Sequence, residues 1–259
     1  MALILLYQRR KELIERILIN GCSHSAGSEI EGSGIGEGNY NRDNCFGALL
    51  AKKLNLPRVN LALPGASNDY IARTTLFWCL EHPELISSTL FLIHWTGADR
   101  MEYFANEYKE TRSWVDEQYD KAVGHVHLAS VWSGFLDKDI DLVKKIAKFI
   151  FRKDCHWEIN RYLNILQIQE LLKAHGAKYV FRNGFNCAVK ALRYEQYYTK
   201  IDQDNFYGLF DKSESFFEHC LEAGFSIEGQ QYWHHGIDAH EYWADRLYNQ
   251  IKKKIDFKN

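Results

Sequence analysis

Residues 17–27 read Ile-Leu-Ile-Asn-Gly-Cys-Ser-His-Ser-Ala-Gly, and this stretch decides the fold class. A short apolar run that ends in Asn-Gly is typical of a buried strand in a parallel sheet. Ser23 follows this strand directly, so we expect it at the carboxyl edge of the sheet, where open α/β folds bind their ligands. A hydroxyl in that place can act as a nucleophile, with its own N–H donating to an oxyanion. The same serine also suits the plainer role of a helix N-cap.

The rest of the chain repeats the alternation of strand and helix. Further apolar runs predict strands at residues 58–63, 89–95 and 177–182. Amphipathic or charged stretches predict helices at residues 8–16, 45–54, 69–80, 160–174 and 238–254. This order implies a parallel sheet with helices on both faces, a three-layer α/β/α sandwich. We expect one α/β domain spanning residues 1–259, with an aromatic-rich insertion at about 100–158.

Composition excludes several classes of protein. The 259 residues are 46% hydrophobic and 25% charged, which excludes disordered, collagen-like and coiled-coil chains. The net charge of −2 gives no basic excess for nucleic acid or an anionic membrane, so neither is expected as a partner. The six cysteines are scattered without a CxxC motif and predict free thiols in a reducing compartment. With an N-terminal apolar run too short for a signal peptide, we expect a cytoplasmic protein.

Two further segments carry candidate site residues. Residues 60–69, Asn-Leu-Ala-Leu-Pro-Gly-Ala-Ser-Asn-Asp, end the second strand in a turn. There Gly65 permits a close backbone approach to a ligand and Asn68 offers an amide donor, although an ordinary βα turn has the same features. Residues 233–244, Trp-His-His-Gly-Ile-Asp-Ala-His-Glu-Tyr-Trp-Ala, place three histidines just before a helix. A histidine on such a loop can be the general base for a serine, and the cluster also suits a metal.

The order and spacing of these three segments resemble the SGNH/GDSL hydrolase superfamily, in particular its poorly characterised bacterial and phage members. Gly-Cys-Ser-His-Ser-Ala-Gly is similar to the first block of that family, with Cys22 in place of its Asp. The resemblance implies the SGNH hydrolase fold with a flavodoxin-like sheet. It also implies Ser23 as the nucleophile, Gly65 as an oxyanion donor, His234 as the base and His240 as a structural residue of the last helix.

The chain departs from the family pattern at the third block. The family Asn falls near Ala98, which has no side-chain donor, and a missing oxyanion donor costs about 3–4 kcal/mol of transition-state stabilisation. Asn68, Thr96 and Arg100 are the candidate replacements. We favour Asn68 because it lies three residues beyond Gly65.

The second departure concerns the acid of the triad. Gln231 stands where the family has Asp, and a Gln can orient an imidazole but cannot neutralise its charge. A backbone carbonyl, Glu228 or Asp238 remain alternatives for this role. Arg73 and Arg100 are read as salt-bridge residues, with contact to an anionic substrate as the alternative.

The resemblance implies a serine-dependent ester hydrolase acting on a small-molecule or carbohydrate ester, with no metal and no cofactor. An acyltransferase and a non-catalytic binding module on the same fold stay open. A metal-dependent hydrolase that uses the histidine cluster is a further alternative, although the sequence holds no HExxH motif. The glycine-rich residues 31–38 match no nucleotide-binding motif, and we interpret them as a loop over the active site.

Overall fold

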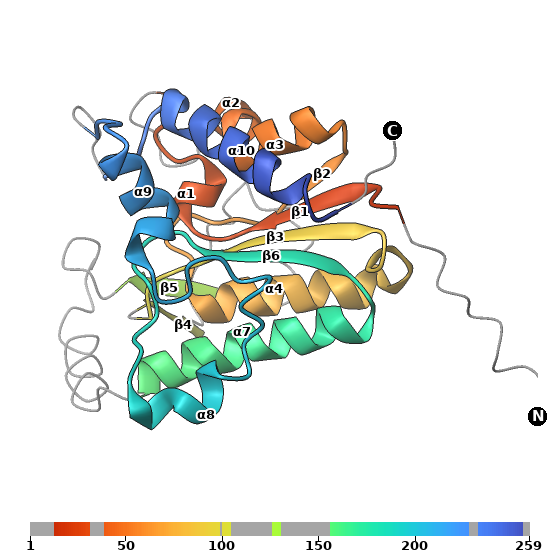
Figure 1. Cartoon of the computed structure of the whole chain (residues 1–259), viewed down its shortest axis with the longest axis vertical. Helices are drawn as coiled ribbons and strands as arrows, with labels where there is room; N and C mark the ends of the chain where they lie inside the picture. The colour runs from red at the N-terminus through yellow and green to blue at the C-terminus, as the bar shows by residue number, and fades with distance from the viewer. Residues whose placement is uncertain are drawn as a thin grey trace, which may run out of the picture.

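A computed structural model describes residues 13–31, 39–98, 100–104, 126–130, 156–227 and 233–255 (Figure 1). In these residues the chain builds a four-stranded parallel sheet with the strand order β2-β1-β3-β6. The strands are β1 (Arg16–Asn20), β2 (Arg58–Asn60), β3 (Thr89–Trp95) and β6 (Lys178–Asn183). The predicted positions of all four strands agree with the structure, although β2 is shorter than residues 58–63.

Helices cover both faces of this sheet. In Figure 1, α3 (Phe46–Leu54) and α10 (Ile237–Ile251) lie above it, and α4 (Asn68–Glu81) and α7 (His156–Ala174) lie below. The shorter helices are α1 (Ser23–Ala26), α2 (Asn39–Asn44), α8 (Glu195–Tyr198), α9 (Phe216–Glu222), η1 (Pro83–Leu85), η2 (Leu192–Tyr194) and η3 (Lys212–Glu214). The predicted three-layer α/β/α sandwich with a parallel sheet is therefore confirmed.

Strand β3 shows why this sequence forms a central strand. All seven of its side chains are buried, as expected for a strand covered on both faces. Leu90 and Leu92 pack into the apolar core beneath α3 and α10. Phe91 and Ile93 point the opposite way, into the core formed with α4 and α7. Burying each such side chain contributes about 1.5–3 kcal/mol, so the strand is fixed from both sides.

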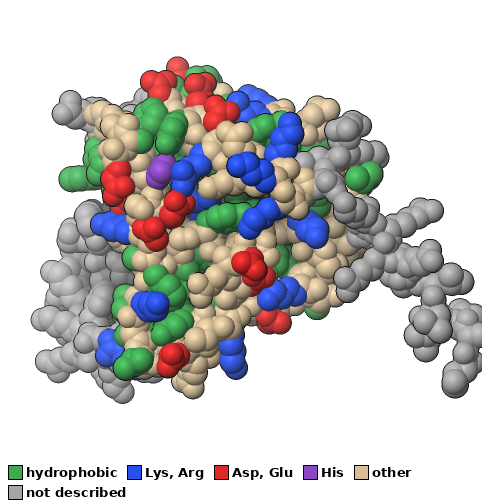
Figure 2. All heavy atoms as spheres, viewed as in Figure 1, with side chains coloured by type: hydrophobic (Ala, Val, Ile, Leu, Met, Phe, Trp, Pro, Cys, Tyr) green, Lys and Arg blue, Asp and Glu red, His purple; other side chains and the backbone are tan. Residues whose placement is uncertain are grey.

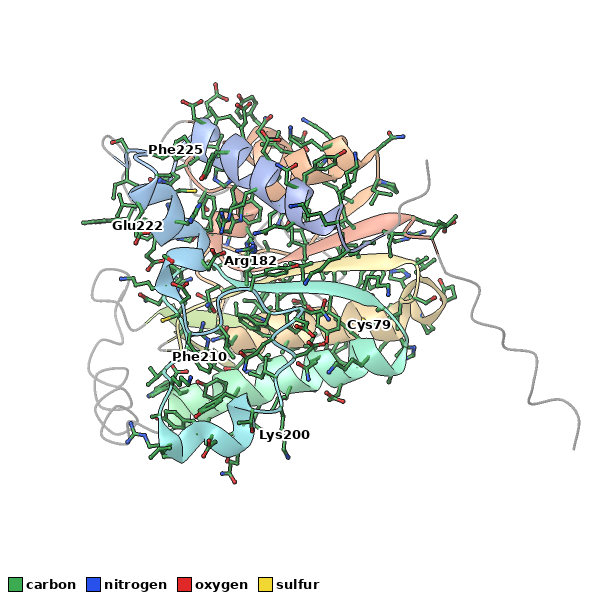
Figure 3. The ribbon with its side chains drawn as sticks, in the orientation of Figure 1. Cys79, Arg182, Lys200, Phe210, Glu222 and Phe225 are labelled. Carbon is green, nitrogen blue, oxygen red and sulfur yellow. The ribbon has the colours of Figure 1, made fainter. Side chains whose placement is uncertain are left out.

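One charged side chain crosses the upper core. Arg182 of β6 is fully buried, and Figure 3 shows it between the sheet and α10. Its Nη1 donates to the backbone oxygen of Glu214 at 3.1 Å and to its carboxylate at 3.2 Å, and its Nη2 donates to Gln250. The guanidinium carbon also lies 4.9 Å from the centre of the Trp243 ring. Burial lowers the pKa of Arg182 to about 10, an effect that Glu214 partly offsets.

Chain topology places the candidate serine at the point where connections diverge. The connection from β1 to β2 runs through α3 on one face, and the connection from β2 to β3 runs through α4 on the other. A crevice forms where neighbouring strands send their connections to opposite faces, and α/β proteins bind ligands there. Helix α1 begins at Ser23 in this place, immediately after β1.

Two expectations about the chain need correction. Residues 14–16 are extended rather than the end of a helix, because the Glu15 N–H pairs with the Ser88 oxygen at 2.8 Å and β1 begins at Arg16. Residues 156–158 belong to α7 and not to the insertion. The insertion contributes β4 (Arg100–Phe104) and β5 (Val126–Ser130), an antiparallel pair. Its other residues, and glycine-rich residues 32–38, lie outside the described ranges.

The surface and the thiols add two observations. Figure 2 shows basic and acidic side chains interspersed over the face that α10 and α7 present. None of the described helices is both long enough and apolar enough for a membrane span. The described cysteines are free thiols, as expected: Cys22, Cys45, Cys79, Cys187 and Cys220.

Candidate active site

The turn between β1 and α1 requires a glycine. Gly21 has φ +154°, and a Cβ at this position would lie 2.3 Å from the Ser25 hydroxyl and 2.9 Å from the His94 carbonyl oxygen. Only glycine avoids both contacts. The turn aims α1 across the sheet edge and leaves Ser23 there, 6% exposed.

Two backbone N–H groups that follow β1 and β2 are candidate oxyanion donors. The pairing of β1 with β2 continues past the strands, with the Leu63 N–H donating to the Gly21 oxygen at 3.1 Å. The turn at Gly65, where φ is +78°, follows two residues after Leu63. Within the described residues, neither the Ser23 N–H nor the Gly65 N–H donates a hydrogen bond. Unpaired N–H groups at a sheet edge can stabilise an oxyanion.

A carboxylate from the same loop orients His234. The Nδ1 atom of His234 lies 2.8 Å from an Oε atom of Glu29, and both side chains are buried. Glu29 adopts φ +62°, which is uncommon for a residue with a side chain and turns the loop back over the site. With Nδ1 donating to the carboxylate, Nε2 of His234 is left to accept a proton.

The carboxylate that contacts His234 lies six residues after Ser23, whereas the sequence analysis sought a triad acid near the C-terminus. Gln231 and Glu228 lie outside the described residues. Asp238 is exposed in the first turn of α10 and makes no hydrogen bond to His234. Nothing in the sequence alone indicated that Glu29 pairs with a residue 205 positions away.

The pKa of His234 reflects this buried setting. Burial lowers it below the usual value, while the hydrogen bond and the charge of Glu29 raise it. The positive charges of Arg100 and His235 lower it further. The net direction is downward, so the ring is neutral at neutral pH, the form that a general base needs.

The contact between the Ser23 segment and His234 is made by His24. The structure has no hydrogen bond between the Ser23 hydroxyl and the His234 ring. The ring of His24, next to Ser23, lies 5.0 Å from the ring of His234, centre to centre. Hydrogen bonds between catalytic groups are often long in the free enzyme and tighten only when substrate is bound.

Asn68 holds the turn after β3. Its amide nitrogen donates to the oxygens of Thr96 and Gly97 at 3.2 and 3.3 Å, and its oxygen accepts the Thr96 N–H at 3.0 Å. Both amide hydrogens are therefore directed to backbone carbonyls. Asn68 would have to release one of them to reach an oxyanion. The Thr96 hydroxyl is buried without a hydrogen-bond partner in the described residues.

The other histidines of the C-terminal segment pack into the fold. His240 accepts the Phe46 N–H at 3.0 Å, which joins α10 to the start of α3, and burial lowers its pKa to about 3. His235 lies 2.9 Å from the Phe217 oxygen. Among the residues with described positions, no three His, Cys, Asp or Glu side chains are grouped to hold a metal ion.

Comparisons with known proteins complete the description. A family model described as "Family of unknown function (DUF6071)" matches residues 30–258. A search of curated protein sequences finds no match. Solved structures similar to this chain include TesA, with 13% identity, 92% of this chain and 99% of that chain covered, and a TM-score of 0.47.

Two esterase structures are also similar. The psychrotrophic esterase EstA from Pseudoalteromonas sp., inhibited by monoethylphosphonate, has 18% identity, 92% and 97% coverage and a TM-score of 0.45. A carbohydrate esterase with divergent catalytic and non-catalytic binding functions has 11% identity, 93% and 69% coverage and a TM-score of 0.41.

Proposed function

The chain belongs to DUF6071, a family of unknown function, and we propose that it is a carboxylic-ester hydrolase with Ser23, His234 and Glu29 as its triad. The buried contact between Glu29 and His234 carries this proposal, because Glu29 follows Ser23 by six residues in the chain. A carboxylate that receives Nδ1–H of a histidine beside a serine is the arrangement that activates a hydroxyl.

The reaction proceeds in two balanced halves. The Ser23 hydroxyl attacks the acyl carbonyl while Nε2 of His234 takes its proton, and Glu29 stabilises the imidazolium. The tetrahedral oxyanion accepts hydrogen bonds from the N–H groups of Ser23 and Gly65. It collapses to an acyl-serine as His234 gives the proton to the departing alcohol oxygen. Water, deprotonated by His234, then attacks the acyl-serine, and the carboxylic acid leaves as Ser23 regains its proton.

The proposal assigns Asn68 a positioning role in place of the oxyanion role expected from sequence. Its three hydrogen bonds to Thr96 and Gly97 fix the turn that follows β3. Two backbone donors remain for the oxyanion. Loss of one such donor typically lowers kcat by about 10²–10³, so two account for a large share of the rate.

The substrate in this proposal is an ester with a small acyl group, and an O-acylated carbohydrate is one candidate. A transferase would follow the same first half and pass the acyl group to a hydroxyl in place of water. Product analysis after acyl-enzyme formation separates these outcomes, because hydrolysis alone releases the free acid without an added acceptor.

Labelling with a fluorophosphonate, read by intact-mass spectrometry, tests the proposal. We expect one adduct on the wild type, none on Ser23→Ala, and much slower labelling of His234→Ala and Glu29→Gln. Ser25→Ala is the matched control, since Ser25 lies on the same short helix but is fully buried. Absence of an adduct on folded wild type, or an adduct that persists in Ser23→Ala, would overturn the assignment.

A further inference from the structure

We propose that the ester substrate carries an anionic group, a carboxylate or a phosphate, and that Arg100 binds this group. The inference rests on the proposed function and adds a substrate class to it.

Arg100 lies between the turn that contains Gly65 and the ring of Phe185. Its Nη1 is 3.4 Å from the oxygen of Ala66, the residue after Gly65. Its guanidinium carbon lies 4.4 Å from the centre of the Phe185 ring. The Phe185 ring in turn lies 5.8 Å from the ring of His24, next to Ser23. The guanidinium is therefore anchored from two sides, within the group of residues that surrounds the serine.

Arg100 has no ion-pair partner among the residues that the structure describes. Among the described side chains, no carboxylate forms an ion pair with it, so the expected salt bridge is absent. By contrast, three other arginines each form an ion pair with a carboxylate: Arg58, Arg182 and Arg246. Glu29, the carboxylate that contacts His234, is 1% exposed and directed to the ring.

The charge of Arg100 opposes protonation of His234, and a bound anion would remove this effect. The positive charge of Arg100 lowers the pKa of both His24 and His234. It therefore disfavours the imidazolium that forms on His234 during catalysis. An anionic substrate group on the guanidinium would cancel this effect while the ester reacts. Arginine suits the task, because its planar fork matches carboxylate and phosphate oxygens.

A cavity of about 330 Å³ is lined in part by residues that lie close to Arg100 and Phe185 in the chain. Ala98, two residues before Arg100, and Asn186, directly after Phe185, both line it. Arg161 and Lys212 add further positive charge to its wall, and Glu158 adds one carboxylate. The volume falls within the range of small-ligand pockets.

Matched esters test the inference. Methyl 4-acetoxybenzoate is neutral, and 4-acetoxybenzoate and 4-acetoxyphenyl phosphate carry the two candidate anions on the same acetyl phenol ester. We expect wild type to favour at least one anionic ester in kcat/KM by about tenfold after correction for their uncatalysed rates, the scale of a charge-assisted hydrogen bond. Arg100→Gln should abolish the preference, Arg100→Lys should keep part of it, and Arg193→Gln, at an exposed position of η2, should keep all of it.

Two results would overturn the inference. One is a wild type that shows no preference for either anion. The other is an equal fall in kcat for neutral and anionic esters in Arg100→Gln, which would identify an oxyanion donor or a structural residue.

A binding measurement separates this inference from the proposed function. Calorimetric titration of Ser23→Ala with 4-acetoxybenzoate and its methyl ester needs no turnover. Tighter binding of the carboxylate, lost in the Ser23→Ala/Arg100→Gln double variant, supports the anion site even if fluorophosphonate labelling fails. Equal binding of the two esters overturns the anion site even if Ser23 is labelled.

Discussion

Glu29 and His234 lie 205 residues apart in the chain, yet their side chains meet at 2.8 Å in the buried part of the site. The carboxylate comes from the loop after β1, whereas the imidazole comes from the segment before the last helix. The pair joins the two ends of the domain at the edge of the sheet.

Glu29→Gln tests whether this pair drives catalysis. The amide can still accept a hydrogen bond but cannot stabilise an imidazolium, so we expect kcat to fall by about 10³–10⁴. Because Glu29 raises the pKa of His234, the acid limb of the residual activity should move to lower pH. Ester hydrolysis between pH 4 and 9 checks both. Asp238→Asn, in an exposed position of the neighbouring helix, is the control, and a comparable loss there would refute the assignment.

The buried histidines predict lower stability in acid. Burial lowers the pKa of His24, His94 and His240, the last to about 3. The unfolded chain then binds more protons than the folded one below about pH 6.5, so the free energy of unfolding falls as pH falls through that value. Urea unfolding at pH 7.5 and pH 5.0 measures the difference. His240→Gln should reduce this pH dependence, and His175→Gln, at an exposed position, should not.

Gly21→Ala should damage the turn that presents Ser23. The new Cβ would lie 2.3 Å from the Ser25 hydroxyl in addition to the strain of φ +154°. Gly176→Ala is the control, since φ is +67° there and no heavy atom lies within 4 Å of the added Cβ. We expect about 1–2 kcal/mol for the control and a larger loss at Gly21, measured by urea unfolding. Equal losses would mean that the contacts of Gly21 relax freely.

Glu214→Ala should leave a buried charge without its partner. Glu214 pairs with both Arg182 and Arg246. Breaking a buried ion pair typically costs about 3–5 kcal/mol, because the remaining charge is uncompensated. Asp245→Ala breaks the exposed pair with Lys53 and should cost at most about 1 kcal/mol. Thermal and urea unfolding of the two variants measure the contrast, and equal costs would contradict the burial argument.

The sequence predicted the fold because its signals are local. Apolar runs closed by glycine marked the strands, and β3 was placed at residues 89–95, as observed. The helix predicted at residues 8–16 is wrong at residues 14–16, and residues 8–12 lie outside the described ranges. The charges of this segment favour a helix, but the pairing of Glu15 with Ser88 overrides that preference.

The candidate site was predictable only in part. Ser23 and Gly65 were predicted because each follows a strand, and parallel strands bring their carboxyl ends to one edge; their roles stay a prediction. Glu29 was missed because its pairing depends on a left-handed backbone turn and on a partner from the far end of the chain. Asn68 was placed correctly at the start of α4, but only the folded chain reveals that its amide is already occupied by residues 96 and 97.

The position of Glu29 divides the proposed triad between two segments of the chain. In the proposed triad the nucleophile Ser23 and the acid Glu29 are six residues apart, while the base His234 comes from a distant segment of the chain. The proposed site is therefore built from two segments of the chain, which meet where Glu29 contacts His234. A shift of residues 23–29 would therefore move both Glu29 and Ser23 away from His234. Activity in this protein should then behave as an all-or-none property of that one junction.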